Sequence, residues 1–299
     1  MADLKKLTAC LRLMRPANLV TSVADVLAGM TISGFFIQYT NDAAHVLPVI
    51  WLCLGTIGLY GGGVVFNDVF DASLDAVERP ERPIPSGLVT LRQAVMLGIC
   101  LLFAGIAGAA LVNPVSGLIA VCIALLALLY DKWGKHQSFL GPLNMGVCRG
   151  LNLLLGISIQ TTALHAWWFL ALVPVIYIAS ITMISRGEVH GGGRPILYAA
   201  GILYLLVTGS ILYFAFTRQT LWLTLIFLLL FAWMIFRPLF SAIRDPSGKN
   251  IGRAVKAGVI ALIVMDASWA AVFGSIALAG FIALLLPVSL WLSGLFSVT

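Results

Sequence analysis

Residues 46–87 read VLPVIWLCLGTIGLYGGGVVFNDVFDASLDAVERPERPIPSG, and this stretch decides the fold. Its first half carries no charged side chain and, at about 20 residues, is long enough to cross a bilayer as a helix. The polar side chains Asn67, Asp68, Asp71, Asp75 and Glu78 then follow within twelve positions. The stretch therefore predicts a membrane-spanning helix that ends in a cluster of acids.

The rest of the chain repeats the apolar part of this pattern. Of its 299 residues, 61% are apolar and 10% are charged, whereas soluble domains carry about 25% charged residues. The apolar runs predict helices over about 17–38, 46–68, 93–112, 115–131, 142–161, 166–185, 195–216, 220–240 and 254–275. The run at 277–297 is either a tenth helix or the end of a bent ninth. We expect an all-α, polytopic transmembrane helical bundle whose first helix is retained, because no cleavage site follows it.

The basic residues predict how this bundle lies in the membrane. Sixteen of the 18 lie in the N-terminal segment and in every second loop, Arg218 is alone in the other loops, and Arg149 lies inside the fifth helix. The positive-inside rule places the N-terminus and these loops in the cytoplasm, and a bacterial inner membrane is the expected location. Because topology accounts for the net charge of +6, we expect no nucleic-acid partner. The five scattered cysteines form no CxxC pair, which argues against zinc or a disulfide framework.

The spacing of the acids is informative. Asn67, Asp71 and Asp75 follow one another at intervals of four, so on a helix they lie within about 80° of one another, and Asp68 falls inside the same arc. Acids on one face repel each other, and a hard divalent cation such as Mg²⁺ would compensate. The alternative is a solvated helix end with capping acids. Oligomeric state is left open by the sequence.

Polar residues inside the predicted spans indicate a cavity, because they are costly in lipid. The first helix carries Asn18 and Asp25, and the fifth carries Asn144, Arg149 and Asn152. An arginine at that depth needs an acceptor. The candidates are Asp25, a diphosphate on a ligand, or another group between the helices.

The first and fifth helices also resemble each other, since Pro16-Ala-Asn18-Leu corresponds to Pro142-Leu-Asn144-Met. We interpret residues 1–299 as a single integral membrane domain with two parallel-repeat halves, about 1–135 and 136–253, followed by C-terminal helices. Such a repeat would place the end of the sixth helix opposite the acid cluster.

That end and one loop supply the counterparts of the acids. The sixth helix ends with Arg186, Glu188 and His190, where His190 is either a ligand-binding residue or an ordinary loop histidine. The loop between the fourth and fifth helices carries Lys132 and Lys135, on the same predicted side of the membrane. Lysine is a common phosphate binder, so at least one of the two is a candidate for that role.

Residues 67–75 and 79–87 resemble the first signature of the UbiA superfamily of intramembrane prenyltransferases, NDxxDxxxD followed by a basic RPxPSG-like stretch. Arg15-Pro-Ala-Asn18 and the segment 130–141 are also similar to that family. At the second signature, where the family usually shows DxxxD, this chain has Ser185-Arg-Gly-Glu188-Val-His190. The stretch SRGEVHGGG resembles a side branch, the EboC-like proteins.

The resemblance implies about nine helices around a central cavity that is open laterally to lipid. It also implies that Mg²⁺ on two acidic motifs holds a polyprenyl diphosphate and promotes loss of pyrophosphate, so that an acceptor, often aromatic, takes the prenyl group. Tyr177 is either an aromatic wall near the reacting carbon or, as we favour, an ordinary residue of a helix interface. The alternative function is a non-catalytic or transport-type isoprenoid- or lipid-binding protein on the same scaffold.

These arguments define the candidate site. The expected catalytic residues are Asp71, Asp75 and Glu188, and the expected metal ligands are Asn67, Asp68, Asp71, Asp75 and Glu188. The expected substrate-binding residues are Asn18, Asn67, Arg79, Arg82, Lys132, Lys135, Asn144, Arg149, Asn152, Arg186 and His190. The expected partners are Mg²⁺, a polyprenyl diphosphate, a lipophilic acceptor and the lipid bilayer.

Overall fold

The structure, a computed structural model, describes residues 2–38, 46–137, 139–188 and 191–296. Within these ranges the chain forms helices and no strand. The first half contains α1 (Ala2–Met14), α2 (Pro16–Ile32), α3 (Phe35–Gln38), α4 (Val46–Phe70), α5 (Ala72–Glu78), α6 (Leu91–Val112), α7 (Pro114–Lys132) and η2 (Gly134–His136). The second half contains α8 (Leu140–Ile157), α9 (Thr161–Trp167), η3 (Trp168–Ala171), α10 (Leu172–Ser185), α11 (Arg194–Thr217), α12 (Leu221–Arg244), α13 (Gly248–Val272), α14 (Ile276–Ala283) and α15 (Leu285–Leu295).

The composition of these helices suits a bilayer. Among the described residues, eight helical stretches are long and apolar enough to cross a membrane, and α2 is a shorter apolar helix. Large apolar side chains such as Phe103, Phe216 and Trp222 point outward from α6, α11 and α12. A water-soluble domain would bury such side chains, whereas lipid accepts them. The expected all-α transmembrane bundle is therefore confirmed.

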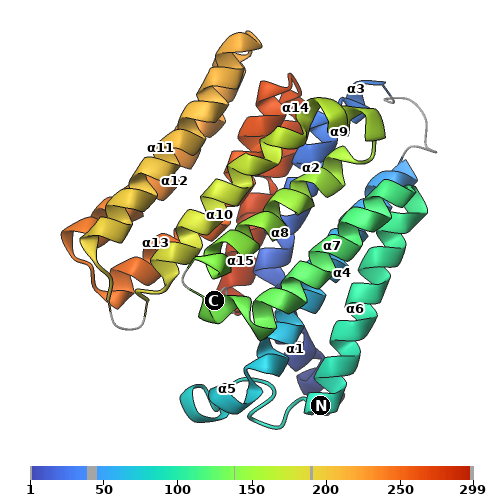
Figure 1. Ribbon diagram of the computed structural model, residues 1–299, viewed down its shortest axis with the longest axis vertical. Helices are drawn as coiled ribbons and strands as arrows, with labels where there is room; N and C mark the ends of the chain where they lie inside the picture. The colour runs from blue at the N-terminus through green and yellow to red at the C-terminus, as the bar shows by residue number, and fades with distance from the viewer. Residues whose placement is uncertain (1, 39–45, 138, 189–190, 297–299) are drawn as a thin grey trace.

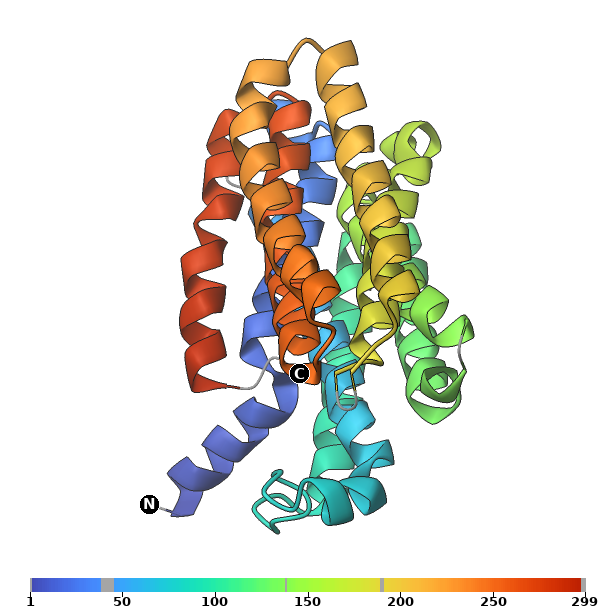
Figure 2. The ribbon, with the colours of Figure 1, turned by 90° about the vertical axis from the view of Figure 1, so that its left-hand side faces the viewer.

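The helices stand roughly side by side, with their ends gathered at two opposite faces of the bundle (Figure 1). Figure 2 shows α1 and α5 at one end and the connection between α11 and α12 at the other. Helix α13 is buried along most of its length. It packs against α2, α10 and α12, so the bundle is organised around a helix that is largely covered by its neighbours.

Helices α2 and α8 cross at backbone distance. A Cβ added to Gly29 would lie 2.8 Å from the amide nitrogen of Ile157, and a Cβ added to Gly156 would overlap the carbonyl of Val26. Small residues at such crossings permit close helix contact in membranes, where burial of apolar surface does not itself drive association. This crossing brings the polar residues of the two helices together in the interior.

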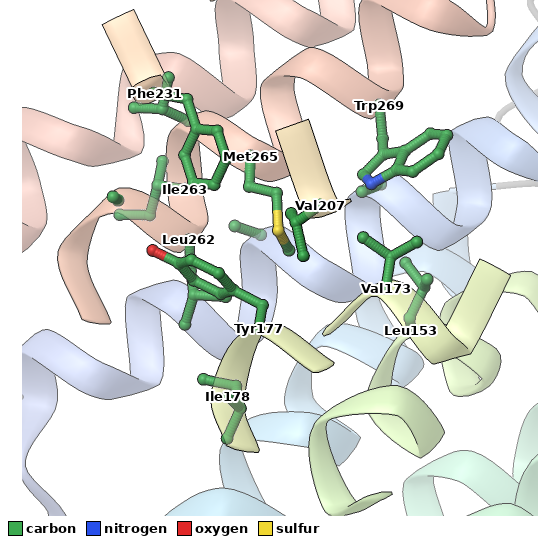
Figure 3. Close-up of a cluster of buried hydrophobic side chains, with 14 of the residues drawn as sticks. Leu153, Val173, Tyr177, Ile178, Val207, Phe231, Leu262, Ile263, Met265 and Trp269 are labelled. Atoms are coloured by element: carbon green, nitrogen blue, oxygen red, sulfur yellow. The ribbon is translucent and has the colours of Figure 1, made fainter. Parts of the chain in front are cut away.

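A large apolar cluster fills the space between α8, α10, α11, α12 and α13 (Figure 3). Tyr177 lies in this cluster, wholly buried, with its hydroxyl donating to the Gly258 carbonyl at 2.8 Å. The rings of Tyr204 and Phe231 lie 5.3 and 5.4 Å from its ring. Of the two roles considered for Tyr177, the ordinary packing residue is confirmed and the aromatic wall is wrong, because the side chain is enclosed by packing and hydrogen bonding.

The observed helices differ from the predicted spans at several points, and the span predicted over 17–38 is divided into α2 and α3. The sixth span consists of α9, η3 and α10 in succession rather than one helix. The last apolar run, for which a tenth helix and the end of a bent ninth were both open, is separate from α13, because the chain turns at Gly274 with φ +84°. It packs back on α2, where Ser289 donates to the Ala17 carbonyl at 3.1 Å. The break at Asp71, between α4 and α5, was not predicted. The proposed parallel repeat stays a prediction.

Candidate functional site

A cavity of about 520 Å³ lies between α2, α4, α7, α8, α10 and α13. At one end it is lined by charged side chains of α5 and the connecting segments next to the ends of α4, α7 and α10. Deeper in the bundle the lining includes Gly63, Val64, Ile123, Ala127 and Ile181. The cavity therefore combines a charged mouth with an apolar interior, which suits a molecule with a charged head and a hydrocarbon tail.

Three residues of the acid cluster share this mouth. Asn67, Asp71 and Asp75 all line the cavity, although α4 ends before Asp71 and α5 begins after it. The backbone bridges the break, since the Asp71 amide donates to the Asn67 carbonyl at 3.0 Å and the Asp75 amide to the Asp71 carbonyl at 2.8 Å. The helical spacing is thus retained across the junction, and the predicted grouping of these three side chains is confirmed.

Asp68 has a different environment. It does not line the cavity; its Oδ1 accepts from Arg15 at 3.1 Å and from Arg82 at 3.3 Å. The side chain is buried, so these two guanidinium groups compensate its charge. The prediction that Asp68 faces the same side as Asn67, Asp71 and Asp75 is corrected: Asp68 holds two arginines at the mouth.

Cations pair with the acids that line the mouth. Arg82 donates to Asp75 Oδ2 at 2.7 Å in addition to Asp68, and Lys135 forms an ion pair with Asp71. Arg15 and Arg79 line the cavity as well. The mouth therefore holds carboxylates and cationic side chains in contact with one another. When a metal ion and a phosphate group bind there together, the carboxylates could bind the metal and the cations could bind the phosphate oxygens.

The sequence did not show which of the two lysines could bind phosphate, and the structure distinguishes them. Lys135 lines the cavity and contacts Asp71. Lys132 is exposed outside the lining, with its ammonium 4.4 Å from the centre of the Trp133 ring. Of the pair, only Lys135 is positioned to meet a ligand in the cavity.

Asp131 is a residue of the mouth that sequence reasoning missed. It is buried, lines the cavity and accepts a hydrogen bond from Asn67 Nδ2 at 3.0 Å. Its Oδ2 has no hydrogen-bond partner among the described residues. The sequence contained a feature that could have identified this residue, because Asp131 is an acid that ends an apolar run on the same predicted side of the membrane as the first cluster.

Of the residues after α10, Glu188 reaches the cavity. Its Oε1 is buried without a hydrogen-bond partner in the described part of the chain. Burial raises the pKa of this carboxyl above its usual value, and the positive charge of Arg79 opposes part of that rise. Arg186 lies outside the lining and donates instead to the Gln137 carbonyl, so its predicted role toward substrate is not supported by its position. His190 lies outside the described residues.

The polar residues of the interior divide in the same way. Asn18, Arg149 and Asn152 line the cavity, as predicted, whereas Asn144 does not and accepts a weak bond from the Cys148 thiol at 3.4 Å. Arg149 Nε lies 2.5 Å from Asp25 Oδ2. The open question about its partner is thereby answered: Arg149 forms an ion pair with Asp25 across the α2–α8 crossing.

The described residues contain no group of three or more His, Cys, Asp or Glu side chains gathered closely enough to hold a metal ion. The oxygen donors at the mouth nevertheless fit Mg²⁺, which is often held by one or two carboxylates together with water and substrate phosphates. The unpartnered oxygen of Glu188 is one such donor that the protein itself does not satisfy.

Comparison with known proteins shows which proteins the chain resembles. The chain is 34% identical over 146 residues to a digeranylgeranylglyceryl phosphate synthase of Methanothrix thermoacetophila, a match that covers 49% of this chain and 52% of that protein. The first curated relatives are thus matched over about half of their length.

Solved structures share the fold. One, described as digeranylgeranylglyceryl phosphate synthase in membranes, has a TM-score of 0.66 and 22% identity and covers 91% of this chain and 99% of its own. A second, a UbiA homolog from Archaeoglobus fulgidus bound to GPP and Mg²⁺, has a TM-score of 0.62 and 16% identity and covers 83% and 99%. The UbiA prenyltransferase family model matches residues 27–254. With more than half of the sequence matched, the chain belongs to the UbiA prenyltransferase family.

Proposed function

We propose that this protein is a Mg²⁺-dependent prenyltransferase that moves a prenyl group from a polyprenyl diphosphate to a lipophilic acceptor within the membrane. The observation that carries the proposal is the cavity itself. One chamber joins a mouth of paired acids and bases to an apolar interior. A diphosphate with an isoprenoid tail has the matching distribution of charge and hydrocarbon.

Asn67, Asp71, Asp75 and Glu188 are the residues that would hold Mg²⁺ together with diphosphate oxygens, and we leave Asp68 out of this set because it does not line the cavity. When bound, the metal neutralises charge that develops on the departing pyrophosphate. Because the second motif has one carboxylate where the family usually has two, the cations of the mouth would neutralise a larger share of the charge on pyrophosphate.

Lys135, Arg82, Arg79 and Arg15 supply that positive charge. As the bond between prenyl C1 and the diphosphate oxygen breaks, its electron pair leaves with pyrophosphate, and cations fixed beside the oxygens stabilise the transition state. An electron pair of the acceptor forms the new bond to C1, and the acceptor's proton leaves with pyrophosphate. The apolar walls around Val64 and Ala127 would keep water from the allylic carbon.

The comparisons support the donor and the metal. Relatives carry the name digeranylgeranylglyceryl phosphate synthase, and the Archaeoglobus fulgidus homolog was solved with GPP and Mg²⁺. By the distribution of basic residues we further propose that the mouth of the cavity faces the cytoplasm.

The test uses the full chain in lipid nanodiscs with geranylgeranyl diphosphate, Mg²⁺ and a membrane lipid extract as the source of acceptor. Pyrophosphate release and prenylated products are measured, the latter by mass spectrometry. We expect release that EDTA abolishes and that Asp71→Asn or Lys135→Met lowers roughly 100-fold, in line with loss of a charge-stabilising group. The matched control, Lys132→Met, should retain activity within about twofold, because Lys132 lies outside the cavity.

Binding of the diphosphate without pyrophosphate release, under every acceptor condition, would favour the alternative of a lipid-binding or transport protein. Equal loss of activity in Lys132→Met and Lys135→Met would show that the mouth is not organised as described.

A further inference from the structure

The inner part of the cavity carries a second polar surface, made of Thr56 and Tyr60 on α4 and Arg149 and Asn152 on α8. We call these four residues the inner wall. Tyr60 precedes Asn67 by seven residues on α4, so the wall lies roughly 10 Å deeper than the mouth at a rise of about 1.5 Å per residue. That separation leaves room for an acceptor between the wall and the reacting end of a prenyl diphosphate.

The hydrogen bonds within the inner wall show which of its side chains can still bind a ligand. Asn152 is fully engaged, since its Nδ2 donates to Asp25 Oδ2 and to the Ser22 carbonyl, both at 2.9 Å, and its Oδ1 accepts from Thr56 at 2.6 Å. Arg149, by contrast, still has a hydrogen-bond donor that is unused. The side chain lines the cavity and is only 6% exposed, and its Nη2 is buried without a hydrogen-bond partner among the described residues. The wall therefore offers donor capacity from an arginine.

The charge of this arginine is already balanced. Asp25 forms an ion pair with Arg149, and the Asp25 side chain is only 1% exposed. The carboxylate of Asp25 carries one negative charge and Arg149 carries one positive charge, so the pair as a whole is neutral.

We propose that the inner wall binds an uncharged carbonyl or hydroxyl oxygen of the acceptor through the guanidinium of Arg149. Arginine has donors and no acceptor atoms, so its partner must be an oxygen that accepts. A bound anion would leave a buried charge uncompensated at the neutral wall, which is costly. The Tyr60 ring, 5.8 Å from Arg149 Cζ, adds a flat apolar surface beside the donor.

This inference deepens the proposed function by naming the chemical class of the acceptor, and it rests on that function. Its test, however, measures binding and not turnover, so the two can fail separately. Three probes share one skeleton: 2-acetylnaphthalene has a neutral ketone, 2-ethylnaphthalene has no oxygen, and 2-naphthoate has a carboxylate. Displacement of tritiated 2-acetylnaphthalene from the full chain in nanodiscs, followed by scintillation proximity, gives their relative affinities.

We expect the wild-type chain to bind the ketone about tenfold more tightly than the hydrocarbon, as for one hydrogen bond to a charged group, and more tightly than the carboxylate. The double substitution Asp25→Asn with Arg149→Leu removes the donor and the charge together, and it should bring the ratio of ketone to hydrocarbon to about one. Asp25→Asn alone uncovers the charge of Arg149 and should shift the preference toward 2-naphthoate.

The control is Thr31→Val on α2, whose hydroxyl bonds only within its own helix, to the Leu27 carbonyl at 2.8 Å. It should keep the wild-type order of the probes. The proposal is overturned if the wild-type chain fails to distinguish ketone from hydrocarbon, or if it prefers the carboxylate. These two comparisons need no variant, so they decide the matter even where the double substitution prevents folding.

Discussion

Adjacent residues of the first motif have different tasks because of partners that are remote in the sequence. Asp68 is held by Arg15, 53 positions away, and by Arg82, whereas Asp71 meets Lys135, 64 positions away. Helical spacing predicted that Asn67, Asp71 and Asp75 lie together. It could not separate Asp68 from them, because the positions of Arg15 and of the loop after α5 determine which acid is turned away from the cavity.

The sequence predicted that Glu188 binds a metal ion, but it did not predict how far the carboxyl is buried or which hydrogen bonds it makes. Its carboxyl is partly buried with one unpartnered oxygen, and burial raises its pKa. The folded chain therefore binds this proton more tightly than the unfolded chain, so ionised Glu188 reduces the free energy of unfolding above the carboxyl's ordinary pKa. A site prepared for a cation would carry such a cost while it is empty.

We expect Glu188→Gln to raise the Tm of the metal-free protein at pH 7.5 by roughly 1–2 °C, the scale of a small change in stability. As the pH falls through the raised pKa of Glu188 toward the ordinary value for glutamate, the wild-type carboxyl becomes protonated and the difference in Tm should vanish. Thermal unfolding of both proteins between pH 7.5 and pH 4 checks this. A difference that grows toward low pH would contradict the burial argument.

At the scale of helices, hydropathy predicted the spans because each must present an apolar surface to lipid. It did not reveal which helices touch. The crossing of α2 and α8 depends on Gly29 and Gly156, where any side chain would meet the backbone of the opposite helix. It also brings Asp25 to Arg149, so the polar interior of the cavity depends on this contact.

Gly156→Ala should therefore lower the free energy of unfolding by about 2–3 kcal/mol, since overpacking forces the two backbones apart. The matched control is Gly209→Ala on α11, where an added Cβ has nothing within 4 Å and alanine favours the helix. That variant should be neutral or slightly more stable. Unfolding in mixed micelles measures both, and equal effects of the two substitutions would show that the α2–α8 crossing is looser than described.

At the scale of the whole molecule, one end of the bundle carries the charged mouth and the other carries little charge. Figure 2 shows α1 and α5 at one end and the α11–α12 connection at the other. Arg218 lies at the latter end, with its guanidinium 4.7 Å from the Trp167 ring and 4.0 Å from the Phe273 ring. Aromatic contacts hold this cation in place. The sequence predicted this asymmetry from residue counts alone, because topology depends on which loops carry charge.

The asymmetry predicts the orientation of the chain. In a variant whose native cysteines are replaced by alanine, Thr217→Cys beside the α11–α12 connection should react with a membrane-impermeant maleimide on intact cells. Glu81→Cys, in the exposed loop after α5, should react only once the membrane is permeabilised, because basic segments are retained in the cytoplasm. Mass tagging of the purified protein measures both reactions. The reverse pattern would place the mouth of the cavity on the outer side, where a cytoplasmic prenyl diphosphate could not reach Asp71 and Lys135, and the proposed reaction would need a different supply of substrate.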